Sequence, residues 1–294
     1  METRILNYFL TIARLGTISA AARELHVAQP TLSRQIQQLE AQLEIPLFTR
    51  EKHRMTLTKA GLTYQLRVQQ ILTELNRTNQ LVKNIDNDEL VGTVSIGCVE
   101  STLMTYLTPL LMNFHEDNPN VSFDLYDADG SAIKDRLDQG LLEVGLVSTP
   151  INAAKYHYLR LPIDDHWGVA VPETSIFRHQ KSVSIDELKD QSVIVPHRQL
   201  VKTELNDWLS PANGNLKIAG EYNLLTNATA LAAAGLGLLI CIEGVALPTA
   251  SQLKFIPFEP EHLLEHFLIW RKGVPLSDPA AALIKFLKSQ LSVQ

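Results

Sequence analysis

The amino-acid sequence predicts an α/β protein in three parts: a small helical head, one long helix and a larger α/β body. Three observations support this organisation. Short helical patterns fill residues 1–58, a heptad pattern continues over residues 59–89, and strand and helix patterns alternate over residues 90–294. A chain of 294 residues is long enough for two or three compact units.

Charge is divided unevenly along this chain, whose net charge is −6. Residues 1–70 carry nine Lys and Arg against five Asp and Glu, whereas the rest carries 17 against 27. A basic head on an acidic body indicates a polyanion partner for the head alone. Two cysteines are too few for a disulfide framework, and the sequence has no apolar run typical of a membrane span or a signal peptide. We therefore expect a cytoplasmic protein.

The head contains two short helices and a third that follows a tight turn. Apolar residues recur at helical spacing in the first helix, which we expect to end at Gly16, and an alanine-rich helix follows around Ser19. Pro30 favours the start of the third helix. Arg34 lies about 200° around that helix from the apolar Leu32, so it points outward. A helix pair of this kind, whose second member presents polar side chains, is a helix-turn-helix.

The polar face of the third helix suits DNA. Gln and Arg pair with adenine and guanine in the major groove, and hydroxyl groups contact phosphates. The segment that follows is typical of a β-hairpin wing with a basic tip, which makes the head a winged helix-turn-helix. The alternative is a small helical bundle with a solvated polar face. The expected DNA-binding residues are Gln29, Pro30, Thr31, Ser33, Arg34, Gln37, Arg50, Lys52 and Arg54.

The long helix at residues 59–89 carries apolar residues at a and d spacing over three heptads. Because a stripe this long and narrow cannot be buried on a small head, it predicts a partner helix in a homodimer. The alternative is a helix that lies on its own body. The expected dimerisation residues are Tyr64, Val68, Ile71, Leu75, Val82 and Ile85.

The body alternates strands and helices in a βαβαβ pattern, which predicts a largely parallel sheet covered by helices on both faces. A second set of strands and helices follows, and a last strand and a terminal helix complete the chain. Two α/β subdomains joined by crossing strands form a cleft, where ligands commonly bind.

The head resembles the DNA-binding head of LysR-type transcriptional regulators almost position by position over residues 9–61. The resemblance rests on the alanine pair after Ser19, Leu25, Gln29-Pro30, Ser33, Leu39-Glu40, Leu47-Phe48, Arg50, Leu57-Thr58 and Gly61. Two positions depart from the family pattern. Ala28 replaces a serine that usually precedes the Gln-Pro step, and Glu44 replaces a glycine that usually follows the recognition helix.

The body is similar to the effector domain of the same family, a periplasmic-binding-protein-like pair of subdomains. The segment "AAAGLGLLICIE" carries this resemblance, with Gly235 and Gly237 in place and Ile242 where a proline is common. The resemblance implies a first subdomain at residues 91–163 and 272–294 and a second at residues 164–271.

The cleft is the expected site of a small-molecule effector. Helix N-termini supply N–H donors and the positive end of a dipole, which suit a small organic anion. Glu100 in the cleft would instead favour an amine in the ligand or pair with Arg198. The resemblance implies that inducers bind at positions around this cleft. The expected effector-binding residues are Glu100, Ser101, Thr102, Ser148, Thr149, His197, Arg198, Thr226 and Asn227.

Motifs of catalysis are missing from the sequence, including the G-x-S-x-G elbow, the P-loop and the Rossmann fingerprint. His262 and His266 are four residues apart, but the strand-like segment after them argues against a helical metal site. Cys98 and Cys241 lie in apolar surroundings typical of inert cysteines; a redox switch is the alternative.

We therefore expect a sequence-specific transcriptional regulator that binds operator DNA and a small-molecule effector, as a homodimer or homotetramer. We expect no catalytic residue, no cofactor and no metal, and a contact with RNA polymerase is left open. The competing classes are a solute-binding protein with an accessory helical domain and an enzyme that uses the cleft, for which the sequence offers no grouped nucleophile and base.

Overall fold

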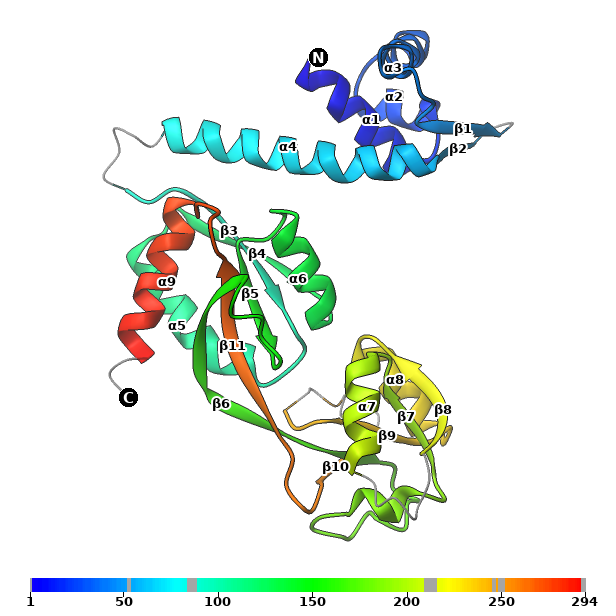
Figure 1. Ribbon diagram of the computed structural model, residues 1–294, viewed down its shortest axis with the longest axis vertical. Coiled ribbons are helices and arrows are strands. Elements are labelled where there is room, and N and C mark those ends of the chain that lie inside the picture. Colours follow the sequence, from blue (N-terminus) through cyan, green and yellow to red (C-terminus); the bar gives the residue numbers. More distant parts are fainter. Residues whose placement is uncertain are drawn as a thin grey trace. The chain divides into compact units, whose positions relative to one another are not determined.

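The structure is a computed structural model (Figure 1) that describes residues 2–51, 54–83, 89–208, 216–244, 247 and 252–291. The chain divides into two compact units, the first formed by residues 1–87 and the second, in the main, by residues 88–294. Lys52 and Ile85, expected to bind DNA and to support dimerisation, lie outside the described residues. No helix among the described residues is long and apolar enough to cross a membrane.

The first unit is a winged helix-turn-helix followed by a long helix. Its elements are α1 (Thr3–Leu15), α2 (Ile18–Glu24), α3 (Gln29–Leu43), β1 (Phe48–Glu51), β2 (Arg54–Leu57) and α4 (Lys59–Lys83). Gly16 ends α1 in the left-handed conformation, and its N–H donates to the carbonyl of Ile12 at 2.8 Å. The side chain of Thr17 caps α2 by accepting from the N–H of Ala20. The strands β1 and β2 pair antiparallel and form the wing.

The core of the head extends onto the first turns of α4. Val68 is 1% exposed within this core, and the ring of Tyr64 contacts that of Phe9 edge-on at 5.0 Å. These two residues of the expected dimer seam are therefore used by the head of the same chain, because the apolar face of α1 lies against this part of α4. Ile71 and Leu75 further along the seam are 51% and 37% exposed.

The second unit contains two α/β subdomains, with β6 and β11 running between them (Figure 1). The first half of its elements are β3 (Gly92–Cys98), α5 (Leu103–Asp117), β4 (Val121–Asp127), α6 (Gly130–Asp138), β5 (Val144–Ser148) and β6 (Tyr156–Val171). The second half are η1 (Ile185–Leu188), β7 (Ser192–Pro196), α7 (Gln199–Trp208), β8 (Lys217–Tyr222), α8 (Leu225–Ala233), β9 (Leu238–Ile242), β10 (Lys254–Pro257), β11 (Leu263–Arg271) and α9 (Asp278–Leu291).

The strand order is β4-β3-β5-β11-β6 in the first subdomain and β6-β9-β7-β8 in the second, with β10 also on β6. The strands β3, β4 and β5 are parallel, as are β7, β8 and β9, whereas β6, β10 and β11 pair antiparallel to their neighbours. This arrangement confirms the α/β class and the crossing strands.

Helices cover both faces of the sheet in each subdomain. Alternate residues of a single strand therefore pack into two different hydrophobic cores. In β11, Leu268 and Trp270 pack with α5 and α9, whereas Phe267 and Ile269 pack with α6. In β9, the even-numbered residues face α7 and the odd-numbered ones face α8.

One expected boundary lies elsewhere in the structure. The second subdomain was expected to extend to residue 271, but β11 pairs with β5 from His266 to Ile269 and packs in the cores of the first subdomain. The chain therefore crosses back before residue 266, because the exposed edge of β5 needs a partner strand. The first half of β6 and the whole of β10 were not expected, since their apolar residues do not alternate regularly.

Candidate DNA interface and ligand pocket

The polar face of the recognition helix α3 is not covered by the rest of the head. Gln29, Pro30, Thr31, Arg34 and Gln37 are exposed, and Ser33 is half-buried. On the other side of the same helix, apolar side chains at most 1% exposed hold α3 against the head. The side chain of Arg34, like that of Arg54 in the wing, forms no hydrogen bond or ion pair with another described residue. The expected face is thus available to a polyanion.

Both departures from the family pattern in the head have local consequences. The side chain of Ala28, at the N-cap of α3, makes no capping hydrogen bond. Glu44, at the C-cap, adopts the left-handed conformation with φ 54° and ψ 24°, and its N–H donates to the carbonyl of Ala41. A non-glycine residue in this conformation costs about 1–2 kcal/mol.

Glu40 joins the end of α3 to the wing. Its Oε1 accepts from the backbone N–H of Leu47 at 2.8 Å and of Phe48 at 3.0 Å, and its Oε2 lies 3.5 Å from Nη2 of Arg50. One carboxylate therefore sets the position of the base of the wing relative to the recognition helix. In the sequence, Glu40 was notable only as part of the family resemblance.

Gly61 brings α4 against the start of the wing. A Cβ atom at Gly61 would lie 2.0 Å from the carbonyl oxygen of Leu47, a separation that only glycine permits. The hydroxyl of Thr58 accepts from the N–H of Gly61 and donates to the carbonyl of Pro46. The beginning of α4 is thereby held to the wing.

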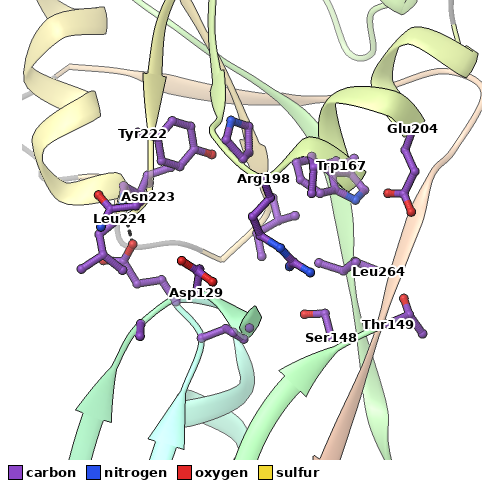
Figure 2. Close-up of a pocket in the computed structure, with 18 residues that line it drawn as sticks. Asp129, Ser148, Thr149, Trp167, Arg198, Glu204, Tyr222, Asn223, Leu224 and Leu264 are labelled. Carbon is purple, nitrogen blue, oxygen red and sulfur yellow. Dashed lines mark hydrogen bonds between the residues drawn. The ribbon is translucent and has the colours of Figure 1, made fainter. Parts of the chain in front are cut away.

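A cavity of about 110 Å³ lies in the second unit and is lined by both subdomains (Figure 2). Of the nine expected effector-binding residues, Glu100, Ser148, Thr149 and Arg198 line it. The other five residues lie outside its lining: Ser101, Thr102, His197, Thr226 and Asn227. His197 borders a second hollow beside Lys134, and Asn227 is exposed.

Two acids of the pocket cap helices. Glu100, after β3, accepts from the N–H of Leu225 at 2.6 Å and from the hydroxyl of Thr226 at 3.3 Å, so it caps α8 of the other subdomain. Asp129 accepts from the N–H groups of Ser131 at 2.8 Å and Ala132 at 3.1 Å at the start of α6. The start of α8, one of the helix N-termini expected to bind an anion, is therefore already occupied by a carboxylate of this chain, and so is the start of α6, which was not among those expected.

The side chains of Arg198 and Glu204 form no hydrogen bond or ion pair with another described residue, and both residues line the pocket. Figure 2 shows Arg198 reaching into the middle of the pocket and Glu204 at its side. Burial raises the pKa of Glu204, the charge of Arg198 opposes this rise, and Asp207 adds to it. Glu204 was missed in the sequence because it lies on one face of a helix with an ordinary amphipathic pattern.

A buried chain of hydrogen bonds reaches the pocket at Ser148. Nδ1 of His266 lies 3.2 Å from the hydroxyl of Ser148, and Nε2 lies 2.8 Å from Oδ2 of Asp165. The hydroxyl of Thr102 donates to Oδ1 of Asp165 at 2.5 Å, and its N–H donates to Oδ2 at 3.3 Å. His266 and Asp165 are 0% and 1% exposed. Sequence separations of 118 and 101 residues hid this serine–histidine–acid set from motif analysis.

The remaining expected caps and histidines have structural contacts. The hydroxyl of Ser101 accepts from the N–H of Leu103 and so caps α5. The ring of His262 stacks on Trp208 with centroids 3.9 Å apart, and burial lowers its pKa. His262 and His266 thus serve separate contacts, one aromatic and one within the buried chain of hydrogen bonds.

Family models match both units of the chain. Residues 87–292 match the "LysR substrate binding domain", and residues 3–62 match the "Bacterial regulatory helix-turn-helix protein, lysR family". The Bacillus subtilis (strain 168) protein called uncharacterized HTH-type transcriptional regulator YybE is 26% identical over 293 residues, which cover 99% of this chain and 100% of that protein. The nitrogen assimilation regulatory protein nac of Klebsiella aerogenes is 28% identical over 248 residues, or 84% and 80% of the two chains.

Solved structures show the same fold over the whole chain. Full-length CbnR in complex with its target DNA has a TM-score of 0.77 at 23% identity, covering 98% of this chain and 99% of that one. CbnR, a LysR family transcriptional regulator, gives a TM-score of 0.79 at 23% identity, over 99% of each chain. The two family models together span nearly the whole sequence, and the chain therefore belongs to the LysR family of DNA-binding transcriptional regulators, which are not enzymes.

Proposed function

We propose that this regulator reads an operator by placing the polar face of α3 in the major groove, with Arg34 and the neighbouring glutamines at base edges. The observation that carries the proposal is that one side of α3 is wholly buried while the polar side has no partner among the described residues. Arg50 and Arg54 of the wing contact the sugar-phosphate backbone or the adjacent groove. Binding to chromosomal DNA places the protein in the cytoplasm.

We infer that the functional form is a homodimer or homotetramer joined through α4. The part of the seam beyond the head, at Ile71, Leu75 and Val82, is apolar and exposed. A partner helix on this stripe would bury it in the manner of a coiled coil. Two heads held in this way read two half-sites, whose spacing the assembly sets.

The pocket of the second unit binds a small effector that carries an anionic group, and Arg198 is the residue that receives it. Support comes from the guanidinium of Arg198, which reaches into the cavity and forms no ion pair with another described residue. Because the pocket is lined by both subdomains, occupancy changes their arrangement and thereby the binding or bending of DNA.

The operator role is tested by recovering genomic fragments with the tagged full-length protein and titrating one recovered site in gel-shift assays. Arg34→Ala should weaken binding about tenfold or more and relax the sequence preference, since a bidentate base contact contributes about 1–3 kcal/mol of discrimination. Arg67→Ala, an exposed arginine on α4, is the matched control and should bind like the parent. Affinity that depends on salt but equally on every sequence would contradict the proposal.

A further inference from the structure

We propose that the effector is a small zwitterion, a molecule that carries an ammonium group and a carboxylate a few atoms apart. This inference rests on the effector-binding role proposed above and names the chemical class of the ligand. Three features of the pocket lead to it: the hydroxyl of Ser148, the carboxylates that occupy the starts of α8 and α6, and the opposite charges of Arg198 and Glu204, whose side chains have no partner among the described residues.

Ser148 offers the pocket a hydrogen-bond acceptor. The carboxylate of Asp165 accepts hydrogen bonds from the backbone N–H and the hydroxyl of Thr102. Because an ionised carboxylate is only an acceptor, Nε2 of His266 carries the proton in its hydrogen bond to Asp165. When the imidazole is neutral, its other nitrogen, Nδ1, accepts the hydroxyl proton of Ser148, as in a Ser-His-Asp triad. The lone pairs of Ser148 are then left for a ligand that supplies a donor.

The helix N-termini of α8 and α6 are not available to an anionic group of the ligand. Glu100 occupies that of α8 and Asp129 that of α6, each through two hydrogen bonds. The pocket lining holds three carboxylates, Glu100, Asp129 and Glu204, against the single guanidinium of Arg198. A ligand that is only an anion would meet this excess of negative charge, and Arg198, next to the start of α7, is the side chain that can receive its carboxylate.

Glu204 supplies the complementary site for a cation. Its carboxylate has no partner among the described residues and stands in the same pocket as Arg198 and Ser148 (Figure 2). An ammonium group placed here donates to Glu204 and to the free lone pairs of Ser148, while Arg198 holds the carboxylate of the same molecule. Each polar group of the ligand is then matched by a group of opposite charge or hydrogen-bonding role.

The size and walls of the pocket limit the rest of the ligand. A cavity of about 110 Å³ is smaller than the engineered apolar cavity of about 150 Å³ that binds benzene. Trp167 and Leu264 contribute apolar wall beside the charged groups. A small amino acid fits these requirements, with its side chain against the apolar wall.

The test is isothermal titration of the full-length protein with each of the twenty L-amino acids. The tightest ligand is then compared with its deaminated carboxylic acid and its decarboxylated amine. We expect at least one amino acid to bind and both truncated analogues to bind about tenfold or more weakly, since hydrogen bonds to charged groups contribute about 1.5–3 kcal/mol.

Variants separate the two ends of the ligand. Glu204→Gln and Ser148→Ala should weaken binding of the amino acid, about tenfold for Glu204→Gln. Neither variant should weaken binding of the deaminated acid, which Glu204→Gln should bind at least as tightly as the parent because a negative charge is removed from the pocket. Arg198→Gln should weaken the binding of both the amino acid and its deaminated acid. Asp207→Asn is the matched control, because Asp207 is an exposed acid on the same helix outside the pocket lining. Since the charge of Asp207 raises the pKa of Glu204, its removal favours the ionised carboxylate, and the control should bind no more weakly than the parent.

Two outcomes would overturn the inference: no amino acid binds, or the deaminated acid binds as tightly as the amino acid and Glu204→Gln has no effect. In the second case, loss of acid binding in Arg198→Gln would preserve the effector role proposed for the pocket. Operator recovery and the Arg34→Ala titration need no effector, so they judge the DNA-binding role independently.

Discussion

Glu44 holds a backbone conformation that glycine adopts more easily. Its φ of 54° places the side chain of a non-glycine residue close to the following carbonyl, and this ends α3 at an energetic cost. Glu44→Gly should therefore raise the free energy of unfolding by about 1 kcal/mol, measured by urea denaturation. Ala41→Gly, within the exposed helical part of α3, should lower it by about the same amount. A destabilised Glu44→Gly protein would show that the glutamate side chain makes a compensating contact.

Burial makes the thiols of Cys98 and Cys241 unreactive by opposing their ionisation. Burial, with the nearby charge of Asp127, raises the pKa of Cys98 to about 12, and burial raises that of Cys241 to about 12. Because almost no thiolate forms at pH 8 in the folded state, an aromatic disulfide reagent should label neither cysteine natively and both in urea. Labelling should stay slow as the pH rises to about 9. Rapid native labelling would restore the redox-switch alternative.

At the scale of elements, the wing depends on a single carboxylate at the end of the recognition helix. Glu40→Ala would leave the N–H groups of Leu47 and Phe48 without their acceptor, and the side chain of Glu40 is only 15% exposed. The free energy of unfolding should fall by about 2 kcal/mol, and hydrogen exchange should increase at those two amides. Glu24→Ala removes an exposed ion pair with Arg14 and should cost less than about 1 kcal/mol.

An equal loss in the Glu40 and Glu24 variants, with unchanged exchange at the wing, would contradict this positioning role for Glu40. Loss of operator affinity in Glu40→Ala without any loss of stability would instead point to a direct DNA contact by Glu40.

Local patterns predicted the elements better than the contacts between them. The apolar spacing of Leu32, Ile36 and Leu39 was sufficient to orient α3, because helix geometry relates those positions directly. The seam on α4 was equally regular, but periodicity does not distinguish a partner helix from the head of the same chain. Tyr64 and Val68 therefore pack where the tertiary structure brings α1 to them.

The pocket shows the same division between local and distant information. Residues at the ends of strands, such as Ser148 and Arg198, were predictable because ligand sites in α/β folds gather there. The acceptor role of Ser148 was not, because it depends on His266 from a strand that crosses back from the second subdomain. Thr226, expected in the pocket, does not line it; its hydroxyl donates to Glu100, which does.

At the scale of the whole molecule, the hydrogen bonds of Glu100 link the two subdomains that line the pocket. They join the end of β3 in one subdomain to the first turn of α8 in the other. A ligand that binds more tightly to one arrangement of the subdomains shifts the equilibrium toward it, and DNA binding shifts ligand affinity by the same factor. The hydrogen bonds of Glu100 thus stabilise the present arrangement of the two subdomains, and an effector would have to act on this equilibrium.

Self-association should depend on the exposed part of the α4 seam. Ile71 and Leu75 are 51% and 37% exposed, and their replacement by glutamate in one double variant would place like charges across a helix pair. We expect the double variant to sediment as a monomer at concentrations where the parent is oligomeric, and to bind a two-half-site operator more weakly than the parent while binding a single half-site equally well. Leu62→Glu is the matched control, since Leu62 is 53% exposed and lies on the opposite side of α4. An unchanged oligomer in the double variant, or dissociation in the control alone, would assign the interface to another face of the chain.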